Sequence, residues 1–230
     1  MTVLSIDLES RSACDLKKHG AYVYWEDETT DLWCACYAFD DEAVRTWRPE
    51  EPCPPRIAEH VMAGGLISGW NVAFERLGWI NRLAPKYGWP LPRLEQFEDT
   101  AAAAAAMALP RGLGDTARAL GIEEQKDDEG YRLMLRMSKP RKPRKGEKAD
   151  AVLWWDEPDR VERLIAYCVK DVEAERAIRK LLVPLSPAER DVYLLDQAMN
   201  DRGVRVDLDL VEALLKITDA AKADLDKRMA

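Results

Sequence analysis

The feature of this sequence that most constrains its fold is a short apolar segment almost at the N-terminus. Its apolar side chains are Val3, Leu4, Ile6 and Leu8. So little polar alternation over residues 2–8 predicts a β-strand that is covered on both faces and lies centrally in its sheet. Asp7 and Glu9 lie two residues apart at the end of this strand, so their carboxylates project from the same face.

Two neighbouring carboxylates at a strand end have two possible meanings. They repel each other and are costly to bury unless a cation lies between them, which makes Asp7 and Glu9 a candidate metal site. Acidic side chains are also common where a strand emerges into water. This pair alone does not decide between the two interpretations, so the rest of the chain has to.

The remaining sequence predicts an α/β fold built on this first strand. Residues 32–39 and 44–47 read as antiparallel strands joined by a polar turn, so the first three strands form a meander. Residues 66–68 read as a short buried strand. Residues 14–20 read as a short helical or irregular piece, and residues 123–157 as rich in loops. Helices are predicted at residues 54–60, 73–87, 99–109, 114–120, 159–182, 187–202 and 208–229.

Charge limits how this chain can meet nucleic acid. The net charge is −8, which excludes proteins that coat duplex DNA by bulk electrostatic attraction. Positive charge is nevertheless concentrated in residues 136–148, against the single acid Glu147. The basic residues of this segment are Arg136, Lys139, Arg141, Lys142, Arg144, Lys145 and Lys148. Such a segment either contacts a nucleic-acid backbone at one place or forms a solvated loop, and both interpretations stay open.

Cysteine usage indicates a reduced, cytoplasmic protein. The five cysteines form no CxxC motif, and an odd number fits poorly with a disulfide framework. Cys34 and Cys36 alternate along a predicted strand and are expected to be buried thiols. With His19 and His60 as the only histidines, a zinc site is not expected. We also expect no signal peptide and no membrane-spanning segment.

Further candidate site residues occur in two of the predicted helices. Glu75 lies in the first turn of the helix predicted from residue 73, where the helix dipole favours an acid, and Asn71 is placed as its N-cap. Tyr167 and Asp171 lie one turn apart on one face of the helix predicted at 159–182. Each feature is ordinary when taken alone. The acids of that helix expected to be solvated are Glu173 and Glu175.

Taken in order along the chain, these residues make three motifs that resemble those of the DEDD (DnaQ-like) 3′–5′ exonucleases. The motifs are Asp7-x-Glu9, Asn71-x-x-Phe74-Glu75 and Tyr167-x-x-x-Asp171. The tyrosine in the third motif places the resemblance in the DEDDy subclass, and it covers residues 1 to about 183. It implies a ribonuclease-H-like exonuclease fold, with a mixed sheet of about five strands flanked by helices. One departure is Glu75, where most of that superfamily has aspartate.

The resemblance also implies roles for these residues. Two divalent cations, Mg²⁺ or Mn²⁺, would be bound by carboxylates, as expected for hard cations with oxygen ligands. Asp7 would bridge both ions, Glu9 and Asp171 would complete the first, and Glu75 would hold the second. Tyr167 would orient the attacking water. The predicted DNA contacts are Ser10, Asn71 and Phe74 at the terminal nucleotide, and Arg141, Lys142, Arg144 and Lys145 on upstream phosphates.

The last part of the chain carries a second resemblance. Residues 185–187, 195–197 and 200–207 are similar to the entry into the polymerase region of phage-type family A (DNA polymerase I-like) enzymes. This implies an exonuclease domain at residues 1–183 and the helical start of a polymerase thumb at residues 184–230. We therefore expect a monomeric proofreading exonuclease that acts on single-stranded DNA 3′ ends, releases nucleoside monophosphates and precedes a polymerase domain.

Two alternative functions remain open from the sequence. The first is an RNA-trimming 3′–5′ exoribonuclease, because the same carboxylates serve the same chemistry on either sugar. The second is a non-catalytic nucleic-acid-binding module with a vestigial metal site. The complete set of four carboxylates and the tyrosine favours an active enzyme over the second alternative.

Overall fold

The computed structural model describes residues 2–122 and 127–229. Within these ranges the strands form one mixed sheet in the order β3-β2-β1-β4-β5, so β1 is central, as its apolar sequence predicts. β2 is antiparallel to β1 and to β3, which gives the predicted meander, whereas β4 is parallel to both β1 and β5. The strands are β1 (Val3–Arg11), β2 (Asp31–Phe39), β3 (Arg45–Trp47), β4 (Leu66–Gly69) and β5 (Phe97–Asp99).

Helices flank the sheet, and most of their bounds agree with the sequence prediction. Those of the first two-thirds of the chain are α1 (Leu16–Glu26), α2 (Pro55–Met62), α3 (Ala73–Gly78), α4 (Ala84–Tyr87), α5 (Thr100–Ala106), α6 (Leu113–Ala119) and α7 (Asp128–Met137). Those that follow are α8 (Pro158–Arg179), α9 (Pro187–Arg202) and α10 (Leu208–Met229). No described helix is both long enough and apolar enough to cross a membrane.

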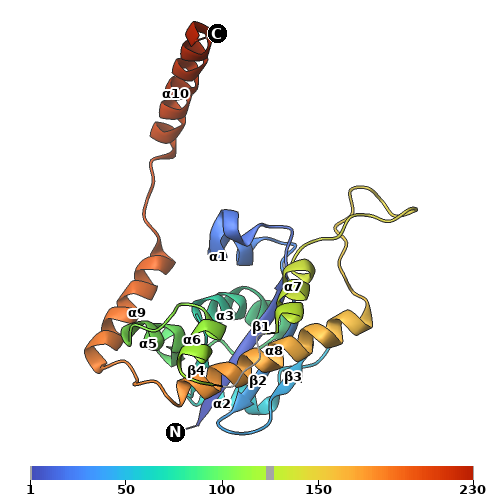
Figure 1. Cartoon of the computed structure of the whole chain (residues 1–230), viewed down its shortest axis with the longest axis vertical. Helices are drawn as coiled ribbons and strands as arrows, with labels where there is room; N and C mark the ends of the chain where they lie inside the picture. Colours follow the sequence, from blue (N-terminus) through green and yellow to red (C-terminus); the bar gives the residue numbers. More distant parts are fainter. Residues whose placement is uncertain (1, 123–126, 230) are drawn as a thin grey trace. The chain divides into compact units, whose positions relative to one another are not determined.

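The two faces of the central strand are covered by different elements. One face of β1 contributes Leu4, Ile6 and Leu8 to a large aromatic core that includes Trp25, Trp47 and Trp79. The opposite face lies under α8, which crosses β1 and β2 (Figure 1). There Ile165, Cys168 and Val172 of α8 pack against Cys34, Cys36 and Ala38 of β2. This arrangement of a mixed five-stranded sheet between helices is consistent with a ribonuclease-H-like fold.

The structure corrects the prediction of residues 123–157 as rich in loops. Residues 128–137 form the helix α7, which begins where the Asp127 side chain accepts a hydrogen bond of 2.8 Å from the Gly130 amide. Met137 is fully buried beside Trp33 and Leu164. The helix spans only ten residues between highly charged segments, and five of its residues are apolar, so its short pattern is easily read as part of a loop. Residues 123–126 lie outside the described part of the chain.

Other boundaries also differ from the prediction. The helix predicted over residues 73–87 is interrupted by a π-helical turn, η1 (Trp79–Leu83). Pro85 follows this turn and cannot donate to the carbonyl of Asn81, so regular α-helical bonding is lost there. The piece predicted at residues 14–20 is α1, capped by Asp15 and kinked at Gly20, which has a φ of 79°. No strand is predicted from the sequence at residues 97–99, where the structure has β5, because a three-residue strand has no readable periodicity. The helix predicted from residue 99 begins at Thr100, with Asp99 as its N-cap.

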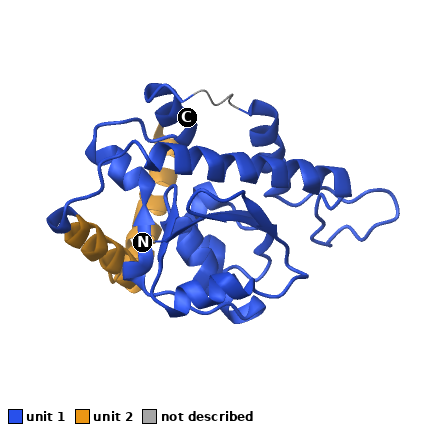
Figure 2. Ribbon diagram, turned by 90° about the horizontal axis from the view of Figure 1, so that it is seen from below, with its two compact units in different colours: residues 1–189 blue, residues 190–230 orange. Residues whose placement is uncertain are grey.

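The chain divides into two compact units, residues 1–189 and residues 190–230 (Figure 2). The first unit contains the whole sheet. The second contains most of α9 and all of α10, and α10 has no buried residue. The division into an exonuclease domain at 1–183 and a thumb segment at 184–230 stays a prediction, since compactness alone does not assign either role.

Candidate active site

One cleft brings together most of the residues singled out from the sequence. It has a volume of about 520 Å³. Its lining includes all five predicted catalytic residues and the three predicted contacts of the terminal nucleotide: Asp7, Glu9, Ser10, Asn71, Phe74, Glu75, Tyr167 and Asp171. These residues come from β1, from the β4–α3 connection and the start of α3, and from α8, which are far apart in the sequence and close together in the fold.

The first two motifs meet because α3 lies very close to β1. Glu75 is in the first turn of α3, as predicted, and is buried. Gly78 of the same helix has no room for a side chain: a Cβ there would lie 2.9 Å from a methyl group of Leu8 and 2.8 Å from the Trp25 ring. The glycine therefore permits the close approach that sets Glu75 beside the carboxylates of β1.

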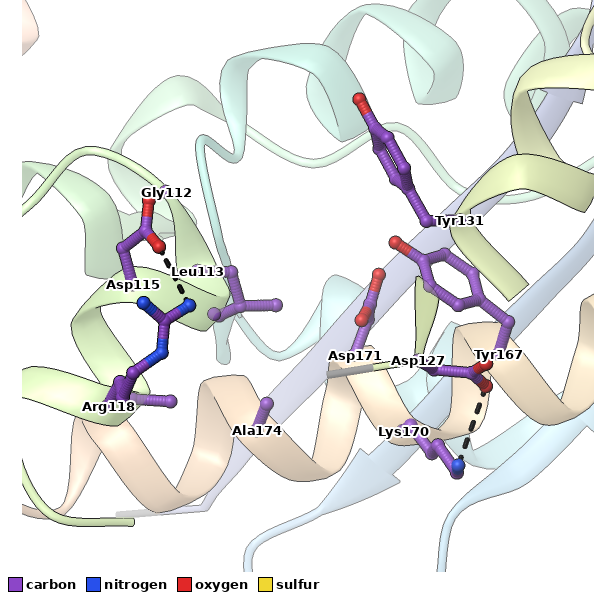
Figure 3. A pocket seen from close by; sticks show the side chains of 12 residues that line it. Gly112, Leu113, Asp115, Arg118, Asp127, Tyr131, Tyr167, Lys170, Asp171 and Ala174 are labelled. Atoms are coloured by element: carbon purple, nitrogen blue, oxygen red, sulfur yellow. Dashed lines mark hydrogen bonds and ion pairs between the residues drawn. The ribbon is translucent and has the colours of Figure 1, made fainter. Parts of the chain in front are cut away.

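The third motif is held by contacts of α8 with its neighbours. Tyr167 and Asp171 lie one turn apart on α8, and their side chains lie next to each other in Figure 3. The tyrosine ring packs on Gly130 of α7, where an added Cβ would lie only 2.5 Å from Tyr167 Cδ2. The α7 helix, which the sequence prediction missed, thus positions a predicted catalytic side chain.

Three carboxyl groups of the cleft, those of Asp7, Glu9 and Glu75, have a raised pKa and are hard to ionise when no cation is bound. Burial raises the pKa of Asp7 from 3.8 to about 6, with neighbouring acidic groups adding to the effect. Burial likewise raises the pKa of Glu9 well above its ordinary value, and Asp7 and Asp171 raise it further. The pKa of Glu75 is also well above normal, from burial first and Asp7 second. The main charged neighbours of all three are other acids and thiols rather than cations.

This donor set fits a hard divalent cation. Oxygen atoms of Asp7 and Glu9 lie with the Cys168 sulfur in a group whose ligand atoms are all within 4.8 Å of one another. Glu75 and Asp171 line the same cleft without joining that compact group. The Glu75 Oε2 atom is buried and has no hydrogen-bond partner within the described residues, and an unpaired buried carboxylate oxygen is costly. A cation bound here would neutralise the repulsion between the carboxylates and would give the Glu75 Oε2 atom a partner.

The predicted nucleotide contacts differ in their surroundings. The Ser10 and Tyr24 hydroxyls share a buried hydrogen bond of 2.8 Å, so Ser10 is already engaged. Phe74 is half-buried, with its ring 5.0 Å from that of Trp25, and serves the core and the cleft together. Asn71 is exposed with a φ of 58°, and α3 begins after Val72, so the prediction of Asn71 as the N-cap is wrong. The backbone N–H of Asn71 instead donates a hydrogen bond to Asp99 Oδ1 at 3.1 Å.

The four basic residues predicted to bind upstream phosphates differ in the partners they have in the structure. Arg141 is held by Glu147, with both terminal nitrogens 2.7 Å from the carboxylate, and donates from Nε to the Trp154 carbonyl at 2.9 Å. Arg144 forms an ion pair with Glu157. Lys142 and Lys145 are exposed, and neither has an ion pair within the described part of the chain. Of the four residues predicted to bind upstream phosphates, Arg141 and Arg144 therefore already pair with acids of this chain. Lys142 and Lys145 do not, within the described residues.

Sequence reasoning missed several residues at or near the site. The cleft is also lined by Lys17, Tyr24 and Lys139. Lys139 belongs to the basic segment 136–148. Glu175, predicted to be solvated, is buried, because its Oε1 atom accepts hydrogen bonds from Ser68 Oγ at 2.5 Å and from Thr100 Oγ1. Its partners lie on β4 and α5, so no local pattern in α8 reveals them.

A second cavity adjoins the first on the other side of Tyr167 and Asp171. It has a volume of about 590 Å³ and is lined by residues of α6, α7 and α8 (Figure 3). Lys170 lies on its wall 3.4 Å from Asp127, and Arg118 pairs with Asp115 at 3.0 Å. Tyr167 and Asp171 therefore stand between two solvent-accessible spaces and can be approached from both.

Fold and cleft together define an α/β protein with a cluster of carboxylates suited to hard divalent cations. No protein-family model matches the chain. A DNA polymerase of Bacillus phage SP02 is 34% identical to it over an alignment of 232 residues. The alignment covers 98% of this chain and 35% of that polymerase. The chain thus spans about a third of the length of the curated relative it matches.

Proposed function

We propose that this chain is a metal-dependent 3′–5′ exonuclease domain associated with a DNA polymerase, hydrolysing single-stranded DNA ends to nucleoside monophosphates. The observation that carries the proposal is the convergence of Asp7, Glu9, Glu75, Tyr167 and Asp171 in one cleft. The similarity to a phage protein named DNA polymerase supports DNA rather than RNA as the substrate. In this proposal the exonuclease proofreads for a polymerase region.

The carboxylates would hold two divalent cations, Mg²⁺ or Mn²⁺, with Asp7 shared between them. Asp7, Glu9 and Asp171 would bind the first ion, and Glu75, through its unpaired Oε2, the second. When bound, such a pair of ions activates water and stabilises both the attacking and the leaving oxygen of a phosphodiester. The residues themselves supply the anchoring and the shape of the cleft.

Tyr167 acts as a hydrogen-bonding residue rather than as a base. Burial, followed by the charge of Asp171, raises the pKa of the Tyr167 hydroxyl far above its ordinary value, so the phenol keeps its proton at neutral pH. A protonated hydroxyl next to a carboxylate orients a water molecule without accepting its proton. The proton of the attacking water would therefore pass to solvent in the cleft rather than to Tyr167.

The experiment is a digestion of end-labelled single-stranded DNA and RNA oligonucleotides with Mg²⁺, Mn²⁺ or a chelator. We expect DNA to be shortened from its 3′ end in a metal-dependent reaction. Asp7→Ala with Glu9→Ala should abolish it, while circular dichroism shows that the chain stays folded. Faster digestion of RNA would favour the exoribonuclease, and DNA binding without cleavage would favour a non-catalytic module. Unchanged digestion by the double variant would refute the site.

A further inference from the structure

Three thiols meet directly behind the carboxylate cluster. Cys34 and Cys36 come from β2 and Cys168 from α8, and each is 0% exposed. Their three sulfur atoms all lie within 4.8 Å of one another, and none is in a disulfide. The chain has five cysteines, and the other two are half-buried: Cys14 lines the cleft, and Cys53 lies against the core on the other face of the sheet.

The strand register explains why the thiols adjoin the acids. In the antiparallel β1–β2 pair Asp7 lies opposite Cys36 and Glu9 lies opposite Cys34. Directly opposed residues project from the same face of a sheet, with Cβ atoms about 4.5–5.5 Å apart. That face is the one covered by α8, which adds Cys168 immediately after Tyr167. Each thiol of β2 therefore stands beside a carboxylate of β1.

Asp7 connects the two groups. The Cys168 thiol donates to Asp7 Oδ2 at 3.1 Å, and Cys168 belongs both to the thiol group and to the compact group formed with Asp7 and Glu9. The thiols themselves are closed to solvent, whereas Asp7 lines the open cleft. A cation that enters along the cleft thus meets Asp7 first and Cys168 next.

We propose that Cys34, Cys36, Cys168 and Asp7 form a site for one thiophilic divalent cation of the Zn²⁺ type. Three thiolates and one carboxylate oxygen make up the four-ligand set that such an ion prefers, and thiolates select it over Mg²⁺. Each thiol that coordinates releases its proton to solvent. Tetrahedral geometry with Zn–S bonds of about 2.3 Å requires sulfur atoms about 3.8 Å apart. The sulfur–sulfur separations need to shrink by at most about 1 Å. Asp7, which is close to Cys168 but is not grouped with Cys34 and Cys36, has to turn toward these two thiols.

Occupation of this site would draw Asp7 away from the cleft. Asp7 is the carboxylate that the proposed nuclease shares between its two hard cations, so a thiophilic ion would inhibit cleavage. This consequence rests on the proposed function, whereas binding of the ion does not. The competing explanation is that the thiols only fill space, since they pack with Ile165 and Val172 in one apolar cluster.

The binding test uses the reduced full chain with Cd²⁺ as the probe, in excess Mg²⁺ to occupy oxygen sites. Ultraviolet charge-transfer absorption of Cd²⁺–thiolate bonds reports coordination by sulfur directly. We expect one Cd²⁺ per chain. Cys34→Ala and Cys168→Ser should each weaken binding by at least about 100-fold, because even removing an outer partner of a metal ligand costs about 10–100-fold. Cys53→Ser is the matched control, because this cysteine packs against the core on the other face of the sheet, and it should bind like wild type.

The outcomes separate binding from nuclease function. Absence of the band, or a band of full strength in folded Cys34→Ala and Cys168→Ser, overturns the site whatever the chain cleaves. In the activity test Cd²⁺ is added to the Mg²⁺-supported reaction, and each variant is compared with its own rate without Cd²⁺. Inhibition should need at least about 10-fold more Cd²⁺ in Cys34→Ala than in Cys53→Ser. A normal band without inhibition of an active enzyme overturns the link to Asp7, and a normal band in an inactive chain refutes the proposed function alone.

Discussion

Replacing Asp7 by Asn should make the metal-free protein more stable while removing its activity. Asparagine has nearly the same shape as aspartate and keeps a side-chain oxygen that can accept the hydrogen bond from the Cys168 thiol. The substitution removes a negative charge from a carboxyl group whose pKa is raised from 3.8 to about 6, first by burial and then by neighbouring acidic groups. Without a cation, that charge works against folding at neutral pH.

The size and the pH dependence of this effect follow from the pKa of Asp7. An increase from 3.8 to about 6 corresponds to about 3 kcal/mol, since each pKa unit is worth about 1.4 kcal/mol. Because the cleft admits solvent, we expect about 1–3 kcal/mol. An acid with a raised folded-state pKa is neutral in both states below 3.8, and its stability contribution is lost as the pH rises through about 6. The advantage of Asp7→Asn should therefore be small near pH 4 and full above pH 7.

Urea denaturation with a chelator present measures this difference, and thermal unfolding supports it. For a chain of this size each kcal/mol corresponds to about 2–4 °C, so Asp7→Asn should melt up to about 12 °C higher at neutral pH. Added Mg²⁺ should stabilise wild type by about 2.7 kcal/mol at 100 times its dissociation constant, and Asp7→Asn much less. Equal stability of the two proteins at pH 7 without metal would refute the argument, as would a difference that grows on acidification.

Further predictions concern the tyrosine, the helix beneath it and the basic segment. Tyr167→Phe should lower the single-turnover cleavage rate with little change in DNA affinity, and a wild-type rate would show that the hydroxyl has no role in the reaction. Gly130→Ala should also slow cleavage, since its Cβ would displace the Tyr167 ring; unchanged kinetics in a folded variant would contradict that contact. Lys142→Gln with Lys145→Gln should flatten the log–log salt dependence of single-strand binding by up to about 1.4, at about 0.7 per phosphate, and a slope equal to wild type would mean that neither lysine touches DNA.

Patterns within single elements account for what the sequence could predict. The two-residue side-chain repeat of a β-strand and the 3.6-residue repeat of the helix around Tyr167 are local, and each places side chains on a known face. The faces of Asp7 with Glu9, and of Tyr167 with Asp171, were therefore readable before any tertiary structure was known. Three such motifs in order also predicted the mixed α/β sheet that the structure contains.

Contacts between distant segments account for most of what the sequence could not predict. Glu175 is buried only because Ser68 and Thr100 come from other elements to meet it. The convergence of Cys168 with the β2 thiols likewise depends on how α8 crosses the sheet. Arg141 is a different case: its partner Glu147 is only six residues away, but spacing within a loop does not specify which side chains meet. Periodicity in the sequence predicts which face of its own element a residue occupies. Which residue it meets there depends on how the elements pack together.

Polar contacts with two different strands of the sheet fix the longitudinal register of α8. Cys168 is bound to Asp7 on β1, and Glu175 to Ser68 on β4. They are seven residues apart, about two helical turns, so both lie on one stripe of α8. A slip by one turn, or a rotation, would break both contacts together and bury an unpaired carboxylate. The distance between the carboxylates of β1 and Asp171 of α8 is therefore set by the same two contacts that hold the helix in place.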